Sequence, residues 1–365
     1  MPTGVHRHPI AFVAYDEGVY AIKELPVHLA MHEFETLRTL EDRTTRTARP
    51  AGLVERAWLE PDDGSAGAVI TRYVEYAFPY RELVMGGSFG IRRNQMLDAF
   101  AGLLVELHVA GCFRGDCSLS NVLYRYDAGA IDTIMVDAET SQLYESISDG
   151  RRREDLEIMK ENLAGGMSDI AAAADRDLDH ADLDIGSDVA DRYGSLWDEL
   201  NSDLVIAPDQ RYLIRQRIDR LNELGFAVND IDLVPDGDGN RVRIRVQVGG
   251  RNFHADRLRR MAGIDASENQ ARHILADFAR HEARRGGYDS PADQAVGVMA
   301  WRASRFAVFT GRITELRPEF DPVQGYADFL NYRHGRSTAA GHDLDSETTF
   351  AEWLEAGMPG FEPVP

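Results

Sequence analysis

The stretch CFRGDCSLSNVLYRYDAGAIDTIMVDAET, residues 112–140, decides the fold of this chain. It places Asn121 five positions after Asp116 and sets Asp137 directly behind the apolar run 131–136. Carboxylate and amide oxygens are suitable Mg²⁺ ligands, so these side chains together fit a metal-nucleotide site. Gly-Asp and Ser-Asn are also common turn residues, and the same side chains could instead form the polar edges of a turn and a hairpin.

The segments around these polar residues have clear periodicity. Residues 92–111 carry an apolar stripe at helical spacing and end at a glycine, which predicts a helix. Residues 121–127 and 131–137 flank Ala128-Gly129 and predict a β-hairpin that turns there. Asp116 therefore lies between the predicted helix and the predicted hairpin, Asn121 begins the hairpin, and Asp137 ends it.

The N-terminal segment predicts a strand, a turn, a second strand and a helix. Residues 8–15 and 19–25 are apolar-rich and are separated by Asp16, Glu17 and Gly18, a hairpin signal. Residues 28–42 then place apolar side chains at helical spacing. A further strand is predicted over residues 67–76.

Lys23 lies near the end of the second of these strands. Lys23 and Lys160 are the only lysines among the 40 basic residues of the sequence; the others are arginines. A lysine kept at this position favours a specific role over that of an ordinary strand-end charge. The helix that follows offers Glu33 and Glu35 as partners for it.

Phosphoryl transfer from ATP needs a cation on the phosphates, oxygen ligands for Mg²⁺ and a carboxylate near the accepting hydroxyl. In protein kinases, a strand lysine precedes a helix glutamate, then an aspartate and an asparagine separated by four residues, then an aspartate after an apolar strand. This chain has a candidate for each part in the same order: Lys23, Glu33 (or Glu35), Asp116, Asn121 and Asp137. The order and the spacing together are far more specific than any one part.

Residues 4–165, which contain these motifs, resemble the atypical branch of the protein-kinase-like fold, close to RIO kinases and lipopolysaccharide core (Kdo and heptose) kinases. Ser118 stands where RIO-type loops carry serine and typical protein kinases carry lysine. More narrowly, the chain resembles the domain-of-unknown-function family 4032. This family joins a lipopolysaccharide-kinase-like segment to a C-terminal domain of its own. The resemblance to it implies no particular activity for this chain. The segments that carry this resemblance are YAIKELP, FPYRELV, GDCSLSNVLYR, DAGA, VDAET, SDGRRREDLEI, RLNELGF and ENQAR.

The resemblance implies ATP and Mg²⁺ as cofactors and assigns the site residues. Lys23 would contact the phosphates, with Glu33 as its ion-pair partner, and Ser118 would also lie at the cofactor. Asp116 would orient or deprotonate the acceptor. Asn121 and Asp137 would hold Mg²⁺, and Asp155 would brace the catalytic loop.

The chain also departs from the kinase pattern. It has no GxGxxG loop, and only Gly4 is available near the expected phosphate loop. Arg114 replaces the histidine of the His-Arg-Asp or His-Gly-Asp motif, and Asp137-Ala138-Glu139 replaces Asp-Phe-Gly. No Ala-Pro-Glu activation segment follows. These departures favour a nucleotide-binding pseudokinase or regulatory scaffold, whereas the retained site residues favour an active phosphotransferase or ATPase whose acceptor is unknown.

The expected fold class is α+β: a two-lobed kinase-like domain followed by a mixed α/β, largely helical C-terminal domain. We place the first domain at residues 1–204, with a small lobe at about 1–75 and a large lobe at about 76–204. The acidic residues 169–203 predict a solvated connector and then a helix near 189–200. The C-terminal domain comprises residues 205–365 and, in the pseudokinase alternative, would engage a protein partner; the acceptor and the partner are both unknown.

The C-terminal half predicts a helix over 210–226 and a hairpin over 231–248 that turns at Asp238-Gly239. Two helices follow within 254–285, the second capped by Asp265 or Ser267. Arginines around this hairpin and these helices suggest a winged-helix-like face for nucleic acid, but interleaved acidic residues favour a solvated or protein-docking face. These arginines are residues 251, 257, 259, 260 and 272.

Composition narrows the function classes. The formal net charge of −21 argues against coating nucleic acid or anionic membrane, and no apolar run approaches the ~18 residues of a membrane span. The start MPTGVHRHPI does not read as a signal peptide, so we expect a cytoplasmic protein. Cys112 and Cys117 are expected to be small buried groups, and His108 a structural histidine.

Overall fold

The computed structural model describes residues 8–44, 46–75, 77–80, 90–207, 209–236, 241–287 and 290–360. Helices and mainly antiparallel strands alternate along them, so the predicted α+β class is confirmed. The chain divides into two compact units. Unit 1 comprises Met1–Arg125, Asp132–Leu221 and Phe226–Arg251, and unit 2 comprises Tyr126–Ile131, Asn222–Gly225 and Asn252–Pro365. The predicted boundary after residue 204 stays a prediction.

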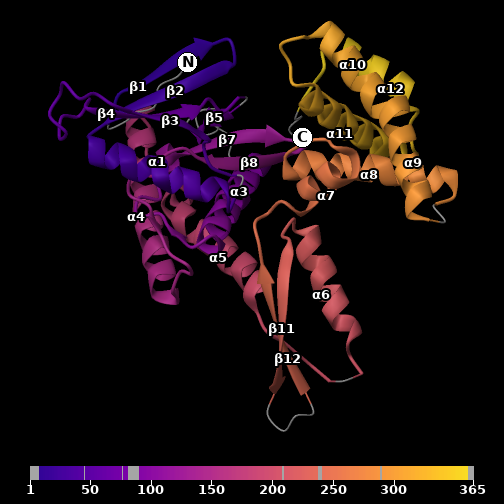
Figure 1. Ribbon diagram of the computed structural model, residues 1–365, viewed down its shortest axis with the longest axis horizontal. Helices are drawn as coiled ribbons and strands as arrows, with labels where there is room; N and C mark the ends of the chain where they lie inside the picture. Colours follow the sequence, from indigo (N-terminus) through magenta and orange to yellow (C-terminus); the bar gives the residue numbers. More distant parts are fainter. Residues whose placement is uncertain are drawn as a thin grey trace. The chain divides into compact units, whose positions relative to one another are not determined.

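The N-terminal part of unit 1 is a four-stranded antiparallel sheet in the order β1-β2-β4-β3, and helix α1 packs against it (Figure 1). The predicted hairpin, helix and later strand are confirmed, whereas β3, with the sequence PAGLVE, has little strand signal. A Cβ atom on Gly67 would lie 2.9 Å from the Ala30 Cβ atom, so this glycine allows α1 to approach β4 closely. The elements are β1 Ile10–Tyr15, β2 Gly18–Leu25, α1 Val27–Glu41, β3 Pro50–Glu55 and β4 Gly67–Arg72.

The next part of unit 1 contains α3, whose buried apolar face confirms the predicted helix. Gly111 follows it with φ +78°, and a Cβ there would lie 2.2 Å from the Tyr144 carbonyl oxygen, so only glycine fits. The hairpin of β7 and β8 turns at Ala128 and Gly129, as predicted, and both of these residues have positive φ and belong to unit 2. The elements are β5 Ala77–Pro79, α3 Gly90–Val109, β6 Cys112–Phe113, η1 Leu119–Asn121, β7 Val122–Asp127, β8 Ala130–Met135 and β9 Gln142–Leu143.

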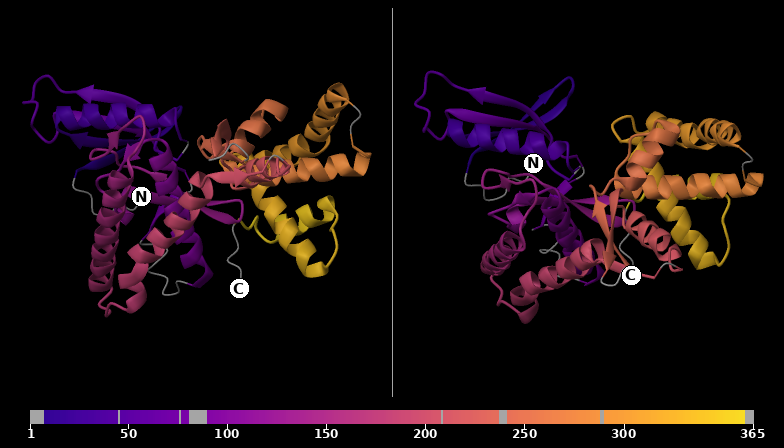
Figure 2. Two further views of the ribbon diagram at one scale, coloured as in Figure 1. Left: turned by 90° about the horizontal axis from the view of Figure 1, so that it is seen from below. Right: turned by 60° about the horizontal axis from the view of Figure 1, so that its bottom comes forward.

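The acidic stretch differs from the prediction of a solvated connector. Helix α4, Asp149–Ala173, continues into it, and α5, His180–Asn201, spans most of the remainder, so only residues 174–179 link the two helices. Both helices lie side by side in the views of Figure 2. The reason is periodicity: Ile185, Val189 and Tyr193 recur every fourth residue and are buried, while most of the acidic residues lie off this stripe.

The last part of unit 1 is a three-stranded sheet in the order β10-β12-β11. The helix and the hairpin predicted over 210–226 and 231–248 are confirmed; the turn at Asp238-Gly239 lies outside the described residues. The elements are β10 Leu204–Ile206, α6 Tyr212–Glu223, β11 Val228–Asp236 and β12 Arg241–Val248.

Unit 2 is largely helical and has an aromatic core. Trp301, Phe329 and Trp353 are fully buried within it. Ser267, not Asp265, is the N-cap of α8, and its backbone N–H donates to Gln270 Oε1 at 3.0 Å. The elements are α7 Phe253–Ala262, α8 Glu268–Arg285, α9 Pro291–Trp301, the π-helix η2 Arg302–Phe306, α10 Ala307–Leu316, α11 Pro322–Ala340 and α12 Ser346–Glu355.

Asp328 in α11 predicts a pH dependence of stability in unit 2. It is 5% exposed, and burial, reinforced by Asp127 and Asp321, raises its pKa to about 7 although Gln324 donates to it. The folded state therefore binds this proton more tightly than the unfolded state, so its stability falls as pH rises from about 4 through 7. Asp328→Asn should raise the melting temperature at pH 8 and change it little at pH 4.

The corresponding gain in unfolding free energy at pH 8 is on the order of 1–4 kcal/mol, since one pKa unit corresponds to about 1.4 kcal/mol. Thermal melts of both proteins at pH 4 and 8 measure it. Asp343→Asn, at an exposed position between α11 and α12, is the control and should show no such pH-dependent gain. Equal differences at both pH values would contradict the buried-carboxyl explanation.

Candidate functional site

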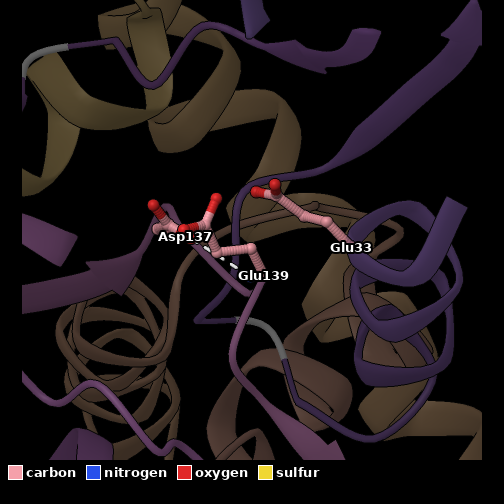
Figure 3. Close-up of side chains that lie close together, drawn as sticks. All are labelled: Glu33, Asp137 and Glu139. Carbon is pink, nitrogen blue, oxygen red and sulfur yellow. Dashed lines mark hydrogen bonds between the residues drawn. The ribbon is translucent and has the colours of Figure 1, made fainter. Parts of the chain in front are cut away.

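Lys23, on β2, stands at the centre of the candidate site in unit 1. Its Nζ atom lies 3.1 Å from Glu33 Oε2, 2.8 Å from Asp137 Oδ2 and 3.0 Å from Glu139 Oε2. Figure 3 shows the three carboxylates converging, one from α1 and two from the segment after β8. The fold therefore brings together residues 114 positions apart in the sequence.

The partner of Lys23 is Glu33 and not Glu35. Helix α1 starts two residues after β2 ends, which directs its first turns along the sheet. Glu33 lies on the same helical face as the buried Ala30 and Leu37 and is 1% exposed, whereas Glu35 is exposed. The ion pair expected from the resemblance is thus present.

With all three carboxyl groups ionised, the cluster of one ammonium and three carboxylates has a formal charge of −2, since +1 and −3 sum to −2. Burial alone lowers the pKa of Lys23, but the Glu33 and Asp137 carboxylates raise it above its ordinary value. Burial raises the pKa of Glu33 to about 7 against the effect of Lys23. For Asp137, burial is outweighed by Lys23, which holds its pKa below the usual range. Lys23 and Asp137 are therefore both charged near neutral pH.

Asp155, in the first turns of α4, braces the loop that precedes Asp116. Its Oδ2 accepts the backbone N–H of Arg114 at 2.7 Å, and its Oδ1 accepts that of Gly115 at 3.0 Å. His108 Nε2 lies 3.0 Å from Asp155 Oδ2, and His108 Nδ1 lies 2.7 Å from the Tyr193 hydroxyl. Burial lowers the pKa of His108, so it is neutral and structural, as predicted. Asp155 therefore makes the backbone contacts expected of it, and its role in catalysis stays a prediction.

Arg114, the residue that replaces the motif histidine, joins the two polar segments of the site. It is 2% exposed, and its guanidinium donates to the carbonyl oxygens of Asp137 at 2.9 Å and Asp116 at 3.3 Å. Its own carbonyl accepts the Thr140 hydroxyl at 2.9 Å. Arg114 therefore connects the segments that carry Asp116 and Asp137, although it differs from the histidine of the kinase pattern.

Asp116 is held from α4, because its Oδ1 accepts a hydrogen bond from Asn162 Nδ2 at 2.9 Å. The Asn121 amide donates to the Asp116 carbonyl at 3.3 Å, and the Val136 N–H donates to the Asn121 carbonyl at 3.2 Å. The backbones around Asp116, Asn121 and Asp137 are thus directly connected. Their side chains are not all in mutual contact in this structure.

Ser118, the remaining predicted residue, hydrogen-bonds the Ser120 hydroxyl at 2.8 Å. No hydrogen bond of its side chain to the Lys23 cluster is found among the described residues. Its expected role at the cofactor stays a prediction. The two cysteines, Cys112 and Cys117, are unpaired and buried, in agreement with their predicted structural role.

Glu33, Asp137 and Glu139 could hold a metal ion. One oxygen from each lies within 4.8 Å of the others, and carboxylate oxygens suit a hard divalent cation. Asp137 is the most accessible member, with 25% of its side chain exposed, compared with 12% for Glu139 and 2% for Glu33. The donor set therefore fits Mg²⁺, with Asp137 best placed to reach it.

The sequence interpretation missed two residues of the site. Glu139 contacts Lys23, and its only local signal is its position two residues after Asp137. Asn162 holds Asp116 from the middle of α4, where its helical segment gives no indication of such a contact. Both depend on a helix or loop packing against a distant segment.

Comparisons with known proteins give one family match and several similar solved structures. Residues 195–358 match the family "Domain of unknown function (DUF4032)". No curated protein matches the sequence. Similar solved structures include two kinases and WaaP, a lipopolysaccharide core kinase.

WaaP in complex with acyl carrier protein is 16% identical, with a TM-score of 0.37 over 61% of this chain and 87% of that chain. The Rio2 kinase–ADP/Mg²⁺–phosphoaspartate complex from Chaetomium thermophilum is 13% identical, with a TM-score of 0.34 over 53% of this chain and 68% of that one. The yeast RNA polymerase II CTD kinase CTDK-1 complex is 15% identical, with a TM-score of 0.28 over 41% and 50%.

Proposed function

Because residues 195–358 match a family described only as a domain of unknown function, we propose a function from the geometry of unit 1: an ATP- and Mg²⁺-dependent phosphotransferase or ATPase of the atypical kinase-like type. The observation that carries this proposal is the convergence of Glu33, from the first helix, and Asp137, from the strand end, on the single lysine of β2. A charged, mostly buried cluster is costly to maintain and favours a functional reason for it.

Each residue of the candidate site would have its own role in phosphoryl transfer. Lys23 would hold the nucleotide phosphates, and Glu33 would keep the ammonium in place. Mg²⁺, when bound to Asp137 and Asn121, would offset the negative charge of the phosphates. Asp116 would accept the proton of the attacking hydroxyl or water as the new P–O bond forms at the γ-phosphorus. The bond from this phosphorus to the bridging oxygen breaks, and ADP leaves with that electron pair.

The loop around Asp116 is suited to this role because it is fixed on three sides. Asp155 accepts both backbone N–H groups of Arg114 and Gly115, Asn162 donates to the Asp116 carboxylate, and the Arg114 guanidinium holds the loop carbonyl. Catalysis by a positioned carboxylate requires such rigidity.

Lys23→Arg tests the proposal without changing the charge. A guanidinium is planar and larger than an ammonium, so it cannot reproduce the compact contacts with three carboxylates. We expect ATP turnover, measured as ADP or phosphate release with Mg²⁺, to fall by a factor on the order of 10, because the positive charge is kept and only its geometry changes. This is below the 10²–10³ typical for complete loss of one transition-state donor.

The control is Lys160→Arg, which changes the other lysine of the chain. Lys160 is partly exposed and pairs with Glu157 at 2.8 Å on α4. This variant should keep the wild-type rate. Full activity in Lys23→Arg would show that Lys23 has only a structural role. The main support for the proposal would then be lost.

The second candidate is a nucleotide-binding pseudokinase or scaffold acting through its C-terminal part on a protein partner. The Asp137-Ala138-Glu139 sequence favours it, because Glu139 adds a third carboxylate to Lys23. In this case Mg-ATP would bind and turnover would stay at background level. The net charge of −21 argues against nucleic acid as a partner. Among the described helices, none is long and apolar enough to cross a membrane.

A further inference from the structure

The Lys23 ammonium has no hydrogen-bond donor left for a nucleotide. An ammonium has three N–H donors. Glu33, Asp137 and Glu139 each place a carboxylate oxygen within 3.1 Å of Nζ. Three carboxylates therefore engage three donors, and a phosphate oxygen can bind Lys23 only where one of the carboxylates leaves it.

The three carboxylates are not equally able to leave. Glu33 is 2% exposed and is confined by α1, and its other oxygen accepts the Ala138 N–H at 3.4 Å. Asp137 is tied to the chain, because its Oδ1 accepts the Glu139 N–H at 3.1 Å. Glu139 has a longer side chain, lies outside any helix or strand, and contacts through its carboxylate only Lys23 and, at 3.4 Å, His8 Nε2 among the interactions described.

The charge of the cluster argues for exchange and against simple addition. With Glu139 in place, one ammonium already faces three carboxylates. A phosphate added without displacement would bring a fourth anion to the same cation in a largely buried setting, where like charges repel strongly. When Glu139 leaves, a phosphate oxygen takes its place as an anionic acceptor.

We propose that Glu139 is an internal counter-anion of Lys23 that occupies the phosphate position, so that nucleotide binds only as its carboxylate is displaced. Glu139 then sets the nucleotide affinity of the site. Because it is covalently tied to the loop that carries Asp137, it competes at a high effective concentration. This inference rests on the proposed nucleotide function.

The first test is Glu139→Gln, which keeps the size of the side chain and removes its charge. Calorimetric titration with ADP in the presence of EDTA measures binding to Lys23 without the metal. We expect affinity to increase about tenfold, the scale of one hydrogen bond to a charged group. Glu35→Gln, an exposed position on the same helix as Glu33, is the matched control and should bind ADP like wild type.

The opposite result has a clear meaning. Weaker or unchanged ADP binding in Glu139→Gln, together with normal binding by wild type, overturns the counter-anion inference and leaves the proposed function standing. Absence of ADP or Mg-ATP binding in every protein overturns the proposed function, and this inference with it.

The second test reads the contact itself and needs no nucleotide. Lys23 and Lys160 are the only lysines in the sequence, so limited acylation followed by peptide mass spectrometry compares two sites within one molecule. Removing the Glu139 charge should release Lys23 and raise its acylation rate relative to Lys160 by roughly three- to tenfold, the scale of one hydrogen bond, because an amine held by fewer partners is more accessible to the reagent. An unchanged ratio shows that Glu139 does not hold Lys23. ADP should slow Lys23 acylation in the variant.

Discussion

Asp116→Asn is expected to lower turnover by a factor on the order of 10²–10⁴, the usual scale for a positioned acid–base group. Mg-ATP affinity should stay within a few-fold of wild type, because Asp116 contacts Asn162 and not the Lys23 cluster. The asparagine side chain can still accept the Asn162 hydrogen bond, so the loop should keep its conformation. Matched measurements of Mg-ATP affinity and ADP release in both proteins test this prediction.

Two outcomes of this experiment separate the enzyme from the pseudokinase. A loss of turnover with intact binding would support Asp116 as the acceptor-side carboxylate. Equal, near-background turnover in wild type and variant, with intact binding, would support the pseudokinase. Asp191→Asn, at an exposed position on α5, controls for a general effect of removing a carboxylate and should behave like wild type.

Asp137→Asn is expected to abolish most of the Mg²⁺-dependent part of nucleotide affinity. We expect a loss on the order of 10²-fold, the upper end of the ~10–100-fold typical for residues that only orient metal ligands. The asparagine oxygen can still accept from Lys23, so the protein should remain folded. Without Mg²⁺, nucleotide affinity should stay equal or increase, because a competing negative charge has been removed from Lys23. Calorimetry with and without Mg²⁺ distinguishes these two effects.

The informative feature of this prediction is that nucleotide affinity falls only when Mg²⁺ is present. A purely structural role for Asp137 would weaken nucleotide binding equally with and without the metal. Unchanged Mg-ATP affinity in the variant would show that the metal is held elsewhere, and circular dichroism of both proteins excludes unfolding as the cause of any loss.

Much of the site could be predicted from the sequence because its parts follow local rules. A strand, a turn and a second strand place Lys23, and the helical period then places Glu33 on the face of α1 that packs on the sheet. Gly129, which adopts positive φ without a steric penalty, is the local signal for the hairpin turn at Ala128-Gly129. Spacing between Asp116 and Asn121 is likewise local, since both lie in one loop.

Only the tertiary structure decided which distant groups meet. The acidic stretch became two packed helices because Tyr193 and its stripe find partners on α3 and α4, which composition does not reveal. Asn162 reaches Asp116 because α4 packs against the loop that carries Asp116. Arg114 reaches the Asp137 carbonyl because the chain returns to this loop after β8. Glu139 was missed for the same reason.

The sequence by itself thus determined the local elements, their order and the residue types suited to phosphates and metal, because periodicity and spacing act over a few residues. The tertiary structure alone decided that Lys23 faces three carboxylates and not one. The physical reason is that the burial and charge of a side chain depend on every segment packed around it, and the segments around Lys23 are 10, 114 and 116 positions away.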